Sequence, residues 1–431
     1  MAAVRARAER LAVTGDVAVV SPPMTEVTHH HGHSPGTPTK PTKTEQLPAS
    51  EEVVEVAPGV IRMQLPIWMP GLGHVNMYGL VDDRGIAVVD PGLPGPQSWK
   101  ALTTRLRSAG YRVKDVHTVI VTHSHPDHFG GAGRIAKTSG ARLITHHSFA
   151  TWTVKGPNAT TTISRHEAEE LELVAATVAQ DTDALPELRP DEIPTIADEP
   201  DIVHDDTDER EPTSMRWGTR TPWGTMNPGP PLKRRVMIRA MRFLFTSPEP
   251  THRVHHGDRV ALAGREWWAV HTPGHTVDHL CLYDPETGTL LAGDHVLPTI
   301  TPHVSGVSKA DSLKSYLATL DLVARLPDVR LGLPAHGELF HDVPGRVEAI
   351  KEHHRERMEL LRSASLSLGP ASVQALAREV FPKRHWGVMA ESETFAHLMH
   401  LLHAGQAESW SQNDELHFRV TPAPVEGERA V

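Results

Sequence analysis

Short apolar and β-branched runs, each bounded by glycine, proline or charged residues, dominate two stretches of the chain, residues 53–150 and 255–345. In the first stretch, the runs that predict strands lie at residues 53–67, 75–92, 116–122 and 141–147. Helical spacing of apolar residues predicts helices at residues 97–109 and 130–140. Strands that alternate with helices in this way predict an α/β fold class with chemistry at the carboxyl ends of strands.

The strand pattern resumes in the second stretch and is followed by a distinct tail. Residues 259–274 and 279–294 predict two hairpins, and a helix and a short strand follow at residues 311–326 and 329–337. In the tail, the pattern predicts a charged helix at residues 345–366, two shorter helices at 371–381 and 393–405, and a strand pair at 407–420. This order of elements predicts a winged-helix-like module.

Two segments do not fit this pattern. Residues 1–50 are rich in Pro, Thr, Ser and His and predict a disordered tail. Its His29, His30, His31 and His33 could bind a metal ion, but we interpret them as solvated. Residues 155–250 predict an insertion, acidic at first and then basic and amphipathic over residues 232–245. The predicted domains are therefore a tail (1–50), a main domain with the insertion (51–345) and a C-terminal unit (346–431).

Composition restricts the classes of function. The chain has 431 residues, of which 39% are hydrophobic, enough for one large domain with appendages. The formal net charge of −10 makes a general binder of nucleic acid or anionic membranes unexpected. A single cysteine, Cys281, excludes a disulfide within the chain and a cysteine-rich zinc site. No run is long enough to span a membrane and no secretion signal is recognised, so we expect a cytoplasmic protein.

One cluster stands out among the 30 histidines, the segment THSHPDHFGG at residues 122–131, which directly follows an apolar strand. His123, His125, Asp127 and His128 place four potential ligands within six residues. Imidazole and carboxylate groups are typical zinc ligands, and a strand that ends in a tight loop can direct several of them toward one point. The cluster therefore predicts metal binding in preference to solvated loop histidines.

Three further candidates follow later strands. His275, Asp294 and His336 each come after an apolar run and next to glycine, which permits tight turns and a close approach of the backbone. A single histidine at a strand end is more often structural, so each candidate is weak when it is taken alone. Together with the first cluster, these three complete a set of seven candidate ligands.

The order of the candidate ligands resembles that of the metallo-β-lactamase-fold hydrolase superfamily: His-x-His-x-Asp-His, then Gly-His, Gly-Asp and a final His. The tail resembles an appendage of the glyoxalase-II-like, winged-helix-tailed members of this superfamily. The resemblance implies a four-layer αβ/βα sandwich with the site at one edge. It also implies two metal ions, zinc with iron or manganese as alternatives. The implied ligands are His123, His125 and His275 for the first ion, Asp127, His128 and His336 for the second, and Asp294 as a bridge.

The same resemblance implies a catalytic domain that hydrolyses an ester, thioester, lactone or related acyl bond of a small molecule. A hydroxide shared by the two metals would attack, and Asp127 would orient it. Asp90, at the end of its own strand, would support the ligands from behind. His279, His295 and His303 lie near the ligands in the sequence and could contact a substrate or form structural hydrogen bonds; both interpretations stay open.

Other functions remain as alternatives. A nuclease or phosphodiesterase of the same fold is favoured mildly by the basic segment 232–245 and disfavoured mildly by the balanced charge of the tail. The same segment could instead pack as a surface helix, act as a lid or contact a membrane. A mononuclear-iron sulfur dioxygenase keeps much of the ligand pattern. A β-lactamase is less expected because a secretion signal is not recognised.

Overall fold

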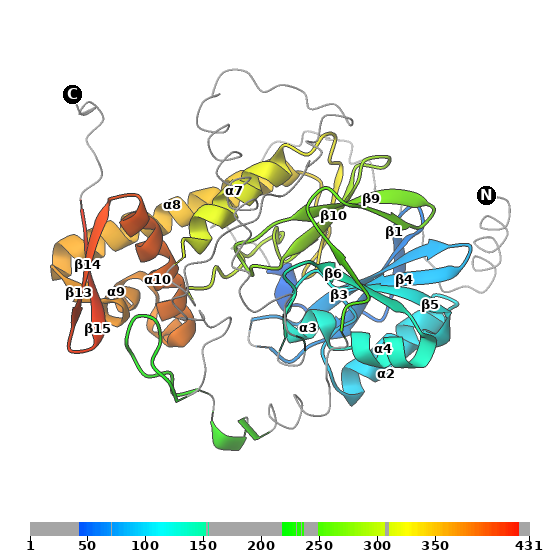
Figure 1. Ribbon diagram of the computed structural model, residues 1–431, viewed down its shortest axis with the longest axis horizontal. Coiled ribbons are helices and arrows are strands. Elements are labelled where there is room, and N and C mark those ends of the chain that lie inside the picture. Colours follow the sequence, from blue (N-terminus) through cyan, green and yellow to red (C-terminus); the bar gives the residue numbers. More distant parts are fainter. Residues whose placement is uncertain are drawn as a thin grey trace, which may run out of the picture.

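The computed structural model describes residues 43–69, 71–151, 154, 218–229, 231–233, 235–236, 249–306 and 310–421. Two sheets form the centre of the molecule (Figure 1). The first sheet contains, in spatial order, β1 (Val53–Ala57), β2 (Val60–Pro66), β3 (His74–Asp82), β4 (Gly85–Val89), β5 (Val116–Ile120), β6 (Arg142–His146) and β7 (His252–Val254). The second contains β12 (Leu331–Pro334), β11 (Thr289–Gly293), β10 (Leu280–Asp284), β9 (Arg265–His271) and β8 (Arg259–Leu262).

The first sheet changes direction partway across. Strands β1 to β4 pair antiparallel, as hairpins do, whereas β4 to β7 pair parallel. Parallel neighbours need crossover connections, and the helices α2 (Pro96–Ser108) and α4 (Ala132–Ser139) supply two of them. The parallel part therefore brings the carboxyl ends of β4, β5 and β6 to one edge of the sheet.

The two sheets pack face to face through buried apolar side chains. The first sheet contributes Tyr78, Val89 and Ile120, and the second contributes Trp267 and Leu291, all at most 2% exposed. Every residue of β4 and β10 is buried, because each strand is covered on both faces. Such strands consist of nearly continuous apolar residues and do not alternate between apolar and polar ones.

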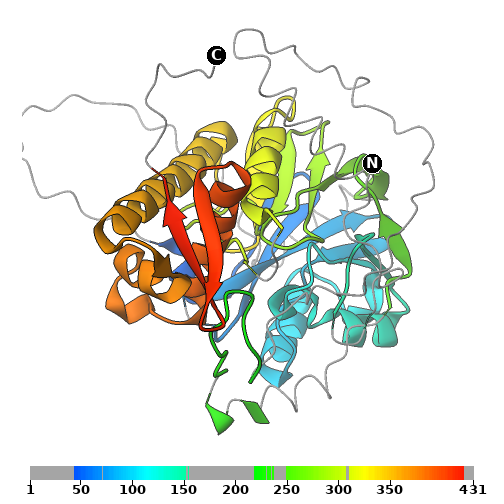
Figure 2. The ribbon, with the colours of Figure 1, turned by 60° about the vertical axis from the view of Figure 1, so that its left-hand side comes forward.

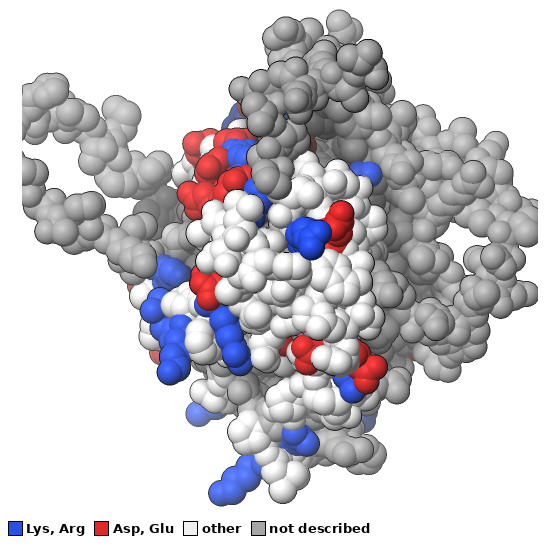
Figure 3. Space-filling view, turned by 90° about the vertical axis from the view of Figure 1, so that its left-hand side faces the viewer, with Lys and Arg blue, Asp and Glu red and all other residues white. Residues whose placement is uncertain are grey.

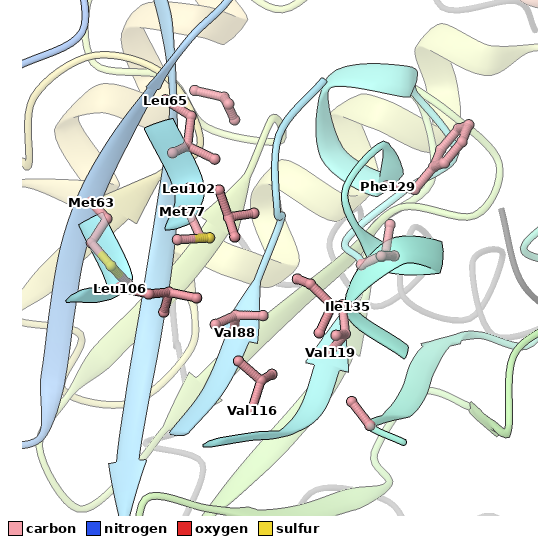
Figure 4. Packing of buried hydrophobic residues seen from close by; sticks show 14 of the residues in the cluster. Met63, Leu65, Met77, Val88, Leu102, Leu106, Val116, Val119, Phe129 and Ile135 are labelled. Carbon is pink, nitrogen blue, oxygen red and sulfur yellow. The ribbon is translucent and has the colours of Figure 1, made fainter. Parts of the chain in front are cut away.

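Helices cover the outer face of each sheet. Leu102 and Leu106 of α2 and Ile135 of α4 pack on the first sheet against residues such as Met77 and Val119 (Figure 4). On the other side, α7 (Ser312–Ala324) and the start of α8 (Val343–Leu368) cover the second sheet through the cluster Tyr283, Leu290, Leu320, Val347 and Ile350. The predicted four-layer αβ/βα sandwich is confirmed.

The C-terminal unit has its own core. It contains the later part of α8, β13 (Ala371–Ser372), α9 (Val373–Val380), α10 (Val388–His403) and the hairpin of β14 (Ala407–Gln412) and β15 (Glu415–Val420). These elements gather beside the sandwich (Figures 1 and 2). The helices and the strand pair predicted for the tail are present in the predicted order, and their assignment as a winged-helix module stays a prediction. Because α8 crosses the predicted boundary at residue 345, the two units share one continuous helix.

Two observations concern the predicted tail and the predicted insertion. The tail does not extend to residue 50, because Thr44–Gln46 form a 3-10 helix with a fully buried Glu45. Part of the insertion is integrated into the fold, since Trp223 is buried in the core of the C-terminal unit against Phe395. Three predicted segments lie outside the described residues. They are residues 1–42, which include the histidine run, the acidic segment 167–211, and most of the basic segment 232–245. Among the described helices, none is long and apolar enough to cross a membrane.

Candidate metal centre

The cluster at residues 122–131 lies at the carboxyl end of β5. The strand ends at Ile120, and the chain then turns into the short helix α3 (Pro126–Phe129), which carries Asp127 and His128. The turn packs closely on the loop after β4: a Cβ atom on Gly130 would lie 2.1 Å from the backbone nitrogen of Pro94. Only glycine fits there, so the Gly130–Gly131 pair that follows the ligands fixes how the helix is placed.

The three later candidates come from the ends of strands in the second sheet. His275 follows β9, Asp294 follows β11 and His336 follows β12. The parallel pairing of β11 with β12 places Asp294 and His336 at the same edge. The structure therefore brings all seven predicted ligands together, in two groups whose ligand atoms lie within 4.8 Å of one another: His123, His125, His275 and Asp294, and Asp127, His128 and His336.

In the first group, three imidazole nitrogens converge. Nδ1 of His125 lies 2.9 Å from Nε2 of His123 and 3.1 Å from Nε2 of His275. Asp294 Oδ2 lies 3.8 Å from His123 Nε2 and 3.6 Å from His275 Nε2. Ligands about 2.0–2.1 Å from a tetrahedral zinc ion are separated by roughly 3.3–3.4 Å. The four distances in this group lie on either side of that value, between 2.9 and 3.8 Å.

In the second group, carboxylate oxygens alternate with imidazole nitrogens. His336 Nε2 lies 3.4 Å from Asp127 Oδ2 and 3.3 Å from Asp294 Oδ1, and His128 Nε2 lies 3.5 Å from each carboxylate. These distances exceed the roughly 2.7–2.9 Å typical of charge-assisted hydrogen bonds. Asp127 Oδ1, Asp294 Oδ1, His128 Nε2 and His336 Nε2 are buried without a hydrogen-bond partner among the described residues. Such atoms are costly to bury unless a cation satisfies them, so the donor set fits a divalent metal ion.

Hydrogen bonds on the far side of each ring point the ligand atoms inward. Nδ1 of His336 donates to the carbonyl of His74 at 2.6 Å, and Nδ1 of His275 donates to the carbonyl of His303 at 2.7 Å. A ring whose Nδ1 carries the proton presents the lone pair of Nε2, so these bonds select the tautomer that binds metal.

Asp90 supports the cluster from the end of β4. Its Oδ2 accepts a hydrogen bond from His128 Nδ1 at 2.9 Å and from the Thr122 hydroxyl at 2.8 Å, and its Oδ1 accepts from the Thr122 backbone at 2.9 Å. The structure thus places Asp90 behind a candidate ligand rather than within either group. Its hydrogen bonds to Thr122 also connect the end of β4 to the end of the neighbouring parallel strand β5.

The two groups differ in charge. Burial, reinforced by neighbouring histidines, holds the pKa of His123 well below its usual value and lowers the pKa of His125 to about 3. Burial also opposes protonation of His336, but the carboxylates of Asp294 and Asp127 outweigh it and raise the pKa of His336 to about 10. The second group therefore attracts positive charge strongly, and protons compete there with a metal cation.

The three other histidines near the ligands have different positions. His279 is buried beneath Asp294, where its Nε2 accepts a hydrogen bond from the Asp294 backbone at 3.0 Å. The side chain of His295 is also fully buried, against Tyr316, which argues against the predicted contact with a substrate. His303 is partly exposed and faces Glu393 at 3.6 Å, so a substrate contact by His303 stays a prediction.

Sequence reasoning missed several residues that build the site. Thr122, His74 and Ser124 carry no sequence signal beyond their nearness to a motif, and Glu45 lies in the segment predicted to be disordered. Asp278 is buried and accepts a hydrogen bond from Ser124 at 3.1 Å; burial raises the pKa of its carboxyl to about 6. Its position three residues after His275 could have suggested a role in the same loop.

The chain belongs to the metallo-beta-lactamase superfamily, whose family model matches residues 70–336, more than half of the chain. A metallo-beta-lactamase family protein from Thermus thermophilus has 26% sequence identity and a TM-score of 0.58, and the match covers 85% of this chain and 100% of that one. A beta-lactamase domain protein from Burkholderia ambifaria shares the fold, with a TM-score of 0.61 at 23% identity over 88% of this chain and 96% of that one.

Curated relatives match over a shorter region. The lactamase-like protein nscB of Trichophyton equinum is 37% identical over 109 residues, which is 25% of this chain and 31% of that protein. The lactamase-like protein adaB of Aspergillus niger is 33% identical over 111 residues, 26% of this chain and 33% of that protein. The chain thus spans about a third of the length of the curated relatives it matches. The superfamily includes hydrolases, and the His/Asp cluster of this chain could hold a divalent metal ion.

Proposed function

We propose that the protein is a dinuclear zinc hydrolase that cleaves an ester, thioester, lactone or related acyl bond of a small molecule. The observation that carries this proposal is the convergence of seven buried or half-buried His and Asp side chains from four strand ends, with buried ligand atoms that lack a hydrogen-bond partner among the described residues. The proposed ligands are His123, His125 and His275 for one ion, Asp127, His128 and His336 for the other, and Asp294 between them.

The donor set favours zinc. It contains only imidazole nitrogens and carboxylate oxygens at distances that suit tetrahedral coordination, although iron and manganese accept the same donors. When bound, two such ions would polarise an acyl carbonyl and lower the pKa of a water molecule.

Asp127 is proposed to orient the attacking water, whose proton ends on the leaving group. Its Oδ2 faces His128 and His336, whereas its Oδ1 is buried without a hydrogen-bond partner among the described residues. Burial opposes ionisation, but the neighbouring His128 and His336 hold the pKa of Asp127 far below its usual range, so it is a carboxylate. Oδ1 of this ionised carboxylate can therefore accept a hydrogen bond from the attacking water and orient it as the new C–O bond forms. The proton of this water then passes to the leaving thiolate or alkoxide as the old acyl bond breaks.

The charge on one described face of the molecule favours an acyl substrate over a nucleic acid. The face shown in Figure 3, which carries the C-terminal unit, has both acidic and basic side chains around a broad uncharged area. A phosphodiesterase that binds a long nucleic acid usually needs a continuous basic surface. The described part of this face does not provide one.

Activity assays on purified protein test the proposal. Esters, thioesters, lactones, β-lactams and phosphodiesters are assayed with and without added zinc, next to the variants His125→Ala and Asp294→Ala. We expect turnover of an acyl substrate that chelation abolishes and zinc restores, and a loss on the order of 10²-fold or more in both variants. Wild-type turnover in either variant would contradict the scheme, as would stoichiometric iron with oxygen consumption or turnover of phosphodiesters alone.

A further inference from the structure

We propose that Glu45, in the short 3-10 helix at Thr44–Gln46, is a positioning residue of the metal centre. It would hold the loop that follows Asp294, and with it the geometry of the metal centre. This inference rests on the proposed function, because it assigns a role toward the proposed metal ions. The segment that carries Glu45 precedes the first strand of the sandwich, and the sequence predicted it to be disordered.

The carboxylate of Glu45 is fully buried and bonds to one loop. Its Oε1 accepts hydrogen bonds from the backbone nitrogens of Thr299 at 2.7 Å and Ile300 at 3.0 Å, and its Oε2 accepts a hydrogen bond from the Thr299 hydroxyl. These partners lie 254 and 255 residues away in the sequence. A buried carboxylate that receives three hydrogen bonds is strongly localised, and so are its donors.

Arg346 of α8 binds the same loop through its carbonyl groups. Its Nε donates to Leu297 at 2.6 Å and its Nη2 donates to Ile300 at 2.7 Å. Glu45 therefore accepts hydrogen bonds from N–H groups of this loop, and Arg346 donates hydrogen bonds to its C=O groups. Together the two side chains hold the loop in place. Backbone groups in a loop have no strand or helix partners, so side chains must satisfy them when the loop is buried.

Both ends of this loop reach the metal centre. Its first residue follows Asp294, a member of the first group whose carboxylate also approaches His128 and His336. The carbonyl of His303, near its other end, accepts the hydrogen bond of His275 Nδ1. A shift of the loop at Thr299 would therefore move a ligand and the orienting partner of another ligand.

The same segment also contacts the turns around His336. The carbonyl of Glu45 accepts from Gly73 at 2.8 Å, and the carbonyl of Leu47 accepts from Nδ1 of His74 at 2.7 Å. His74 in turn supplies the carbonyl that orients His336, and its Nε2 accepts from the Gly337 backbone at 3.2 Å. Residues 44–47 therefore join the loop after Asp294 to the turn that carries His336, and the metal centre depends on both.

Zinc affinity tests this role apart from activity. Glu45→Ala removes all three side-chain hydrogen bonds, whereas Glu45→Gln keeps a carbonyl oxygen for Thr299 and Ile300. Loss of a residue that orients metal ligands typically costs about 10–100-fold in metal affinity. We expect Glu45→Ala to weaken zinc binding by that factor in a chelator competition, because the loop and the segment together reach Asp294 and the orienting partners of His275 and His336. We expect Glu45→Gln to stay within about threefold of wild type, because most of its hydrogen bonds survive.

Asp284 provides the matched control. It is also fully buried, and it accepts from Glu286 and Thr287 and pairs with Arg265 at 2.9 Å, at the end of β10 opposite His279. Asp284→Ala and Glu45→Ala should both lower the melting temperature, but Asp284→Ala should weaken neither zinc-binding step. The visible absorption of the cobalt-substituted protein should change only in Glu45→Ala.

The outcomes separate the two proposals. Wild-type protein that binds no zinc overturns the proposed function, and this inference with it. Wild-type protein that binds two zinc ions, together with Glu45→Ala protein that keeps both affinities and the cobalt spectrum, overturns only the role of Glu45. Equal loss of affinity in Asp284→Ala also overturns it, because the effect would then reflect general destabilisation.

Discussion

Asp90 accepts a hydrogen bond from Nδ1 of His128 at 2.9 Å while its own backbone has a φ of +53°, a conformation that non-glycine residues rarely adopt. Such a conformation costs free energy, on the order of 1–3 kcal/mol, and persists where the surroundings enforce it. Here the Thr122 backbone and hydroxyl hold the carboxylate, and the carboxylate holds the ring of a candidate ligand.

Asp90→Asn should weaken metal binding although the two side chains have nearly the same shape. An amide has one acceptor oxygen, and if that oxygen serves the Thr122 backbone, its NH₂ group faces His128 Nδ1. The imidazole would then carry its proton on Nε2, the atom that faces the metal position. We expect about a 10–100-fold lower affinity for one zinc ion, measured by chelator competition. Unchanged affinity would show that Asp90 does not set the tautomer of His128.

The sandwich could be predicted from the sequence because its strands are continuous apolar runs and its ligands follow them directly. The residues from His123 to His128 lie in one segment, and each later ligand follows a run beside glycine, so the motif and the strand ends coincide. Glu45 could not be predicted in this way. Its partners lie 254 and 255 residues away, and a single hydrogen-bonding side chain leaves no periodic pattern.

The position of Trp223 shows the same limit. It lies within the segment 155–250 that the sequence predicts to be an insertion, whereas its partners belong to the C-terminal unit. Its indole Nε1 donates to Glu391 at 2.9 Å, and its carbonyl accepts from Leu416 at 3.0 Å. Only the folded structure brings these segments together.

Trp223→Ala should destabilise the C-terminal unit. The side chain is 1% exposed, and its removal leaves a cavity beside Phe395 and takes one hydrogen-bond donor from Glu391. The expected loss is about 3–5 kcal/mol in the free energy of unfolding, measured with urea. Trp386→Ala, at a site that is 43% exposed, should cost about 1 kcal/mol or less. Similar losses in both variants would mean that the insertion does not pack on this unit as described.

Acid should destabilise the protein partly through His354. Its side chain is buried and Nδ1 lies 3.0 Å from His397 Nε2; burial, with the nearby His397 and His353, lowers its pKa from 6.5 to about 3. The unfolded chain therefore takes up a proton first as the pH falls below 6.5, and stability is lost between pH 6.5 and about 3. Between about pH 7 and 5, this one group should cost about 2 kcal/mol.

His354→Gln should lose less stability than wild type over that pH range, whatever its stability at neutral pH. Urea unfolding of both proteins at neutral pH and at about pH 5 measures the difference, and contributions from the metal centre cancel between them. Identical pH dependence in the two proteins would show that His354 is not held in its neutral form.

Seven side chains are proposed to hold two metal ions in this protein. Anomalous diffraction at the zinc absorption edge, from crystals of the zinc-loaded protein, would locate these ions. We expect two peaks per chain, one beside His123, His125 and His275 and the other beside Asp127, His128 and His336, with Asp294 next to both. A single peak, no peak, or peaks only at other residues would contradict this proposal.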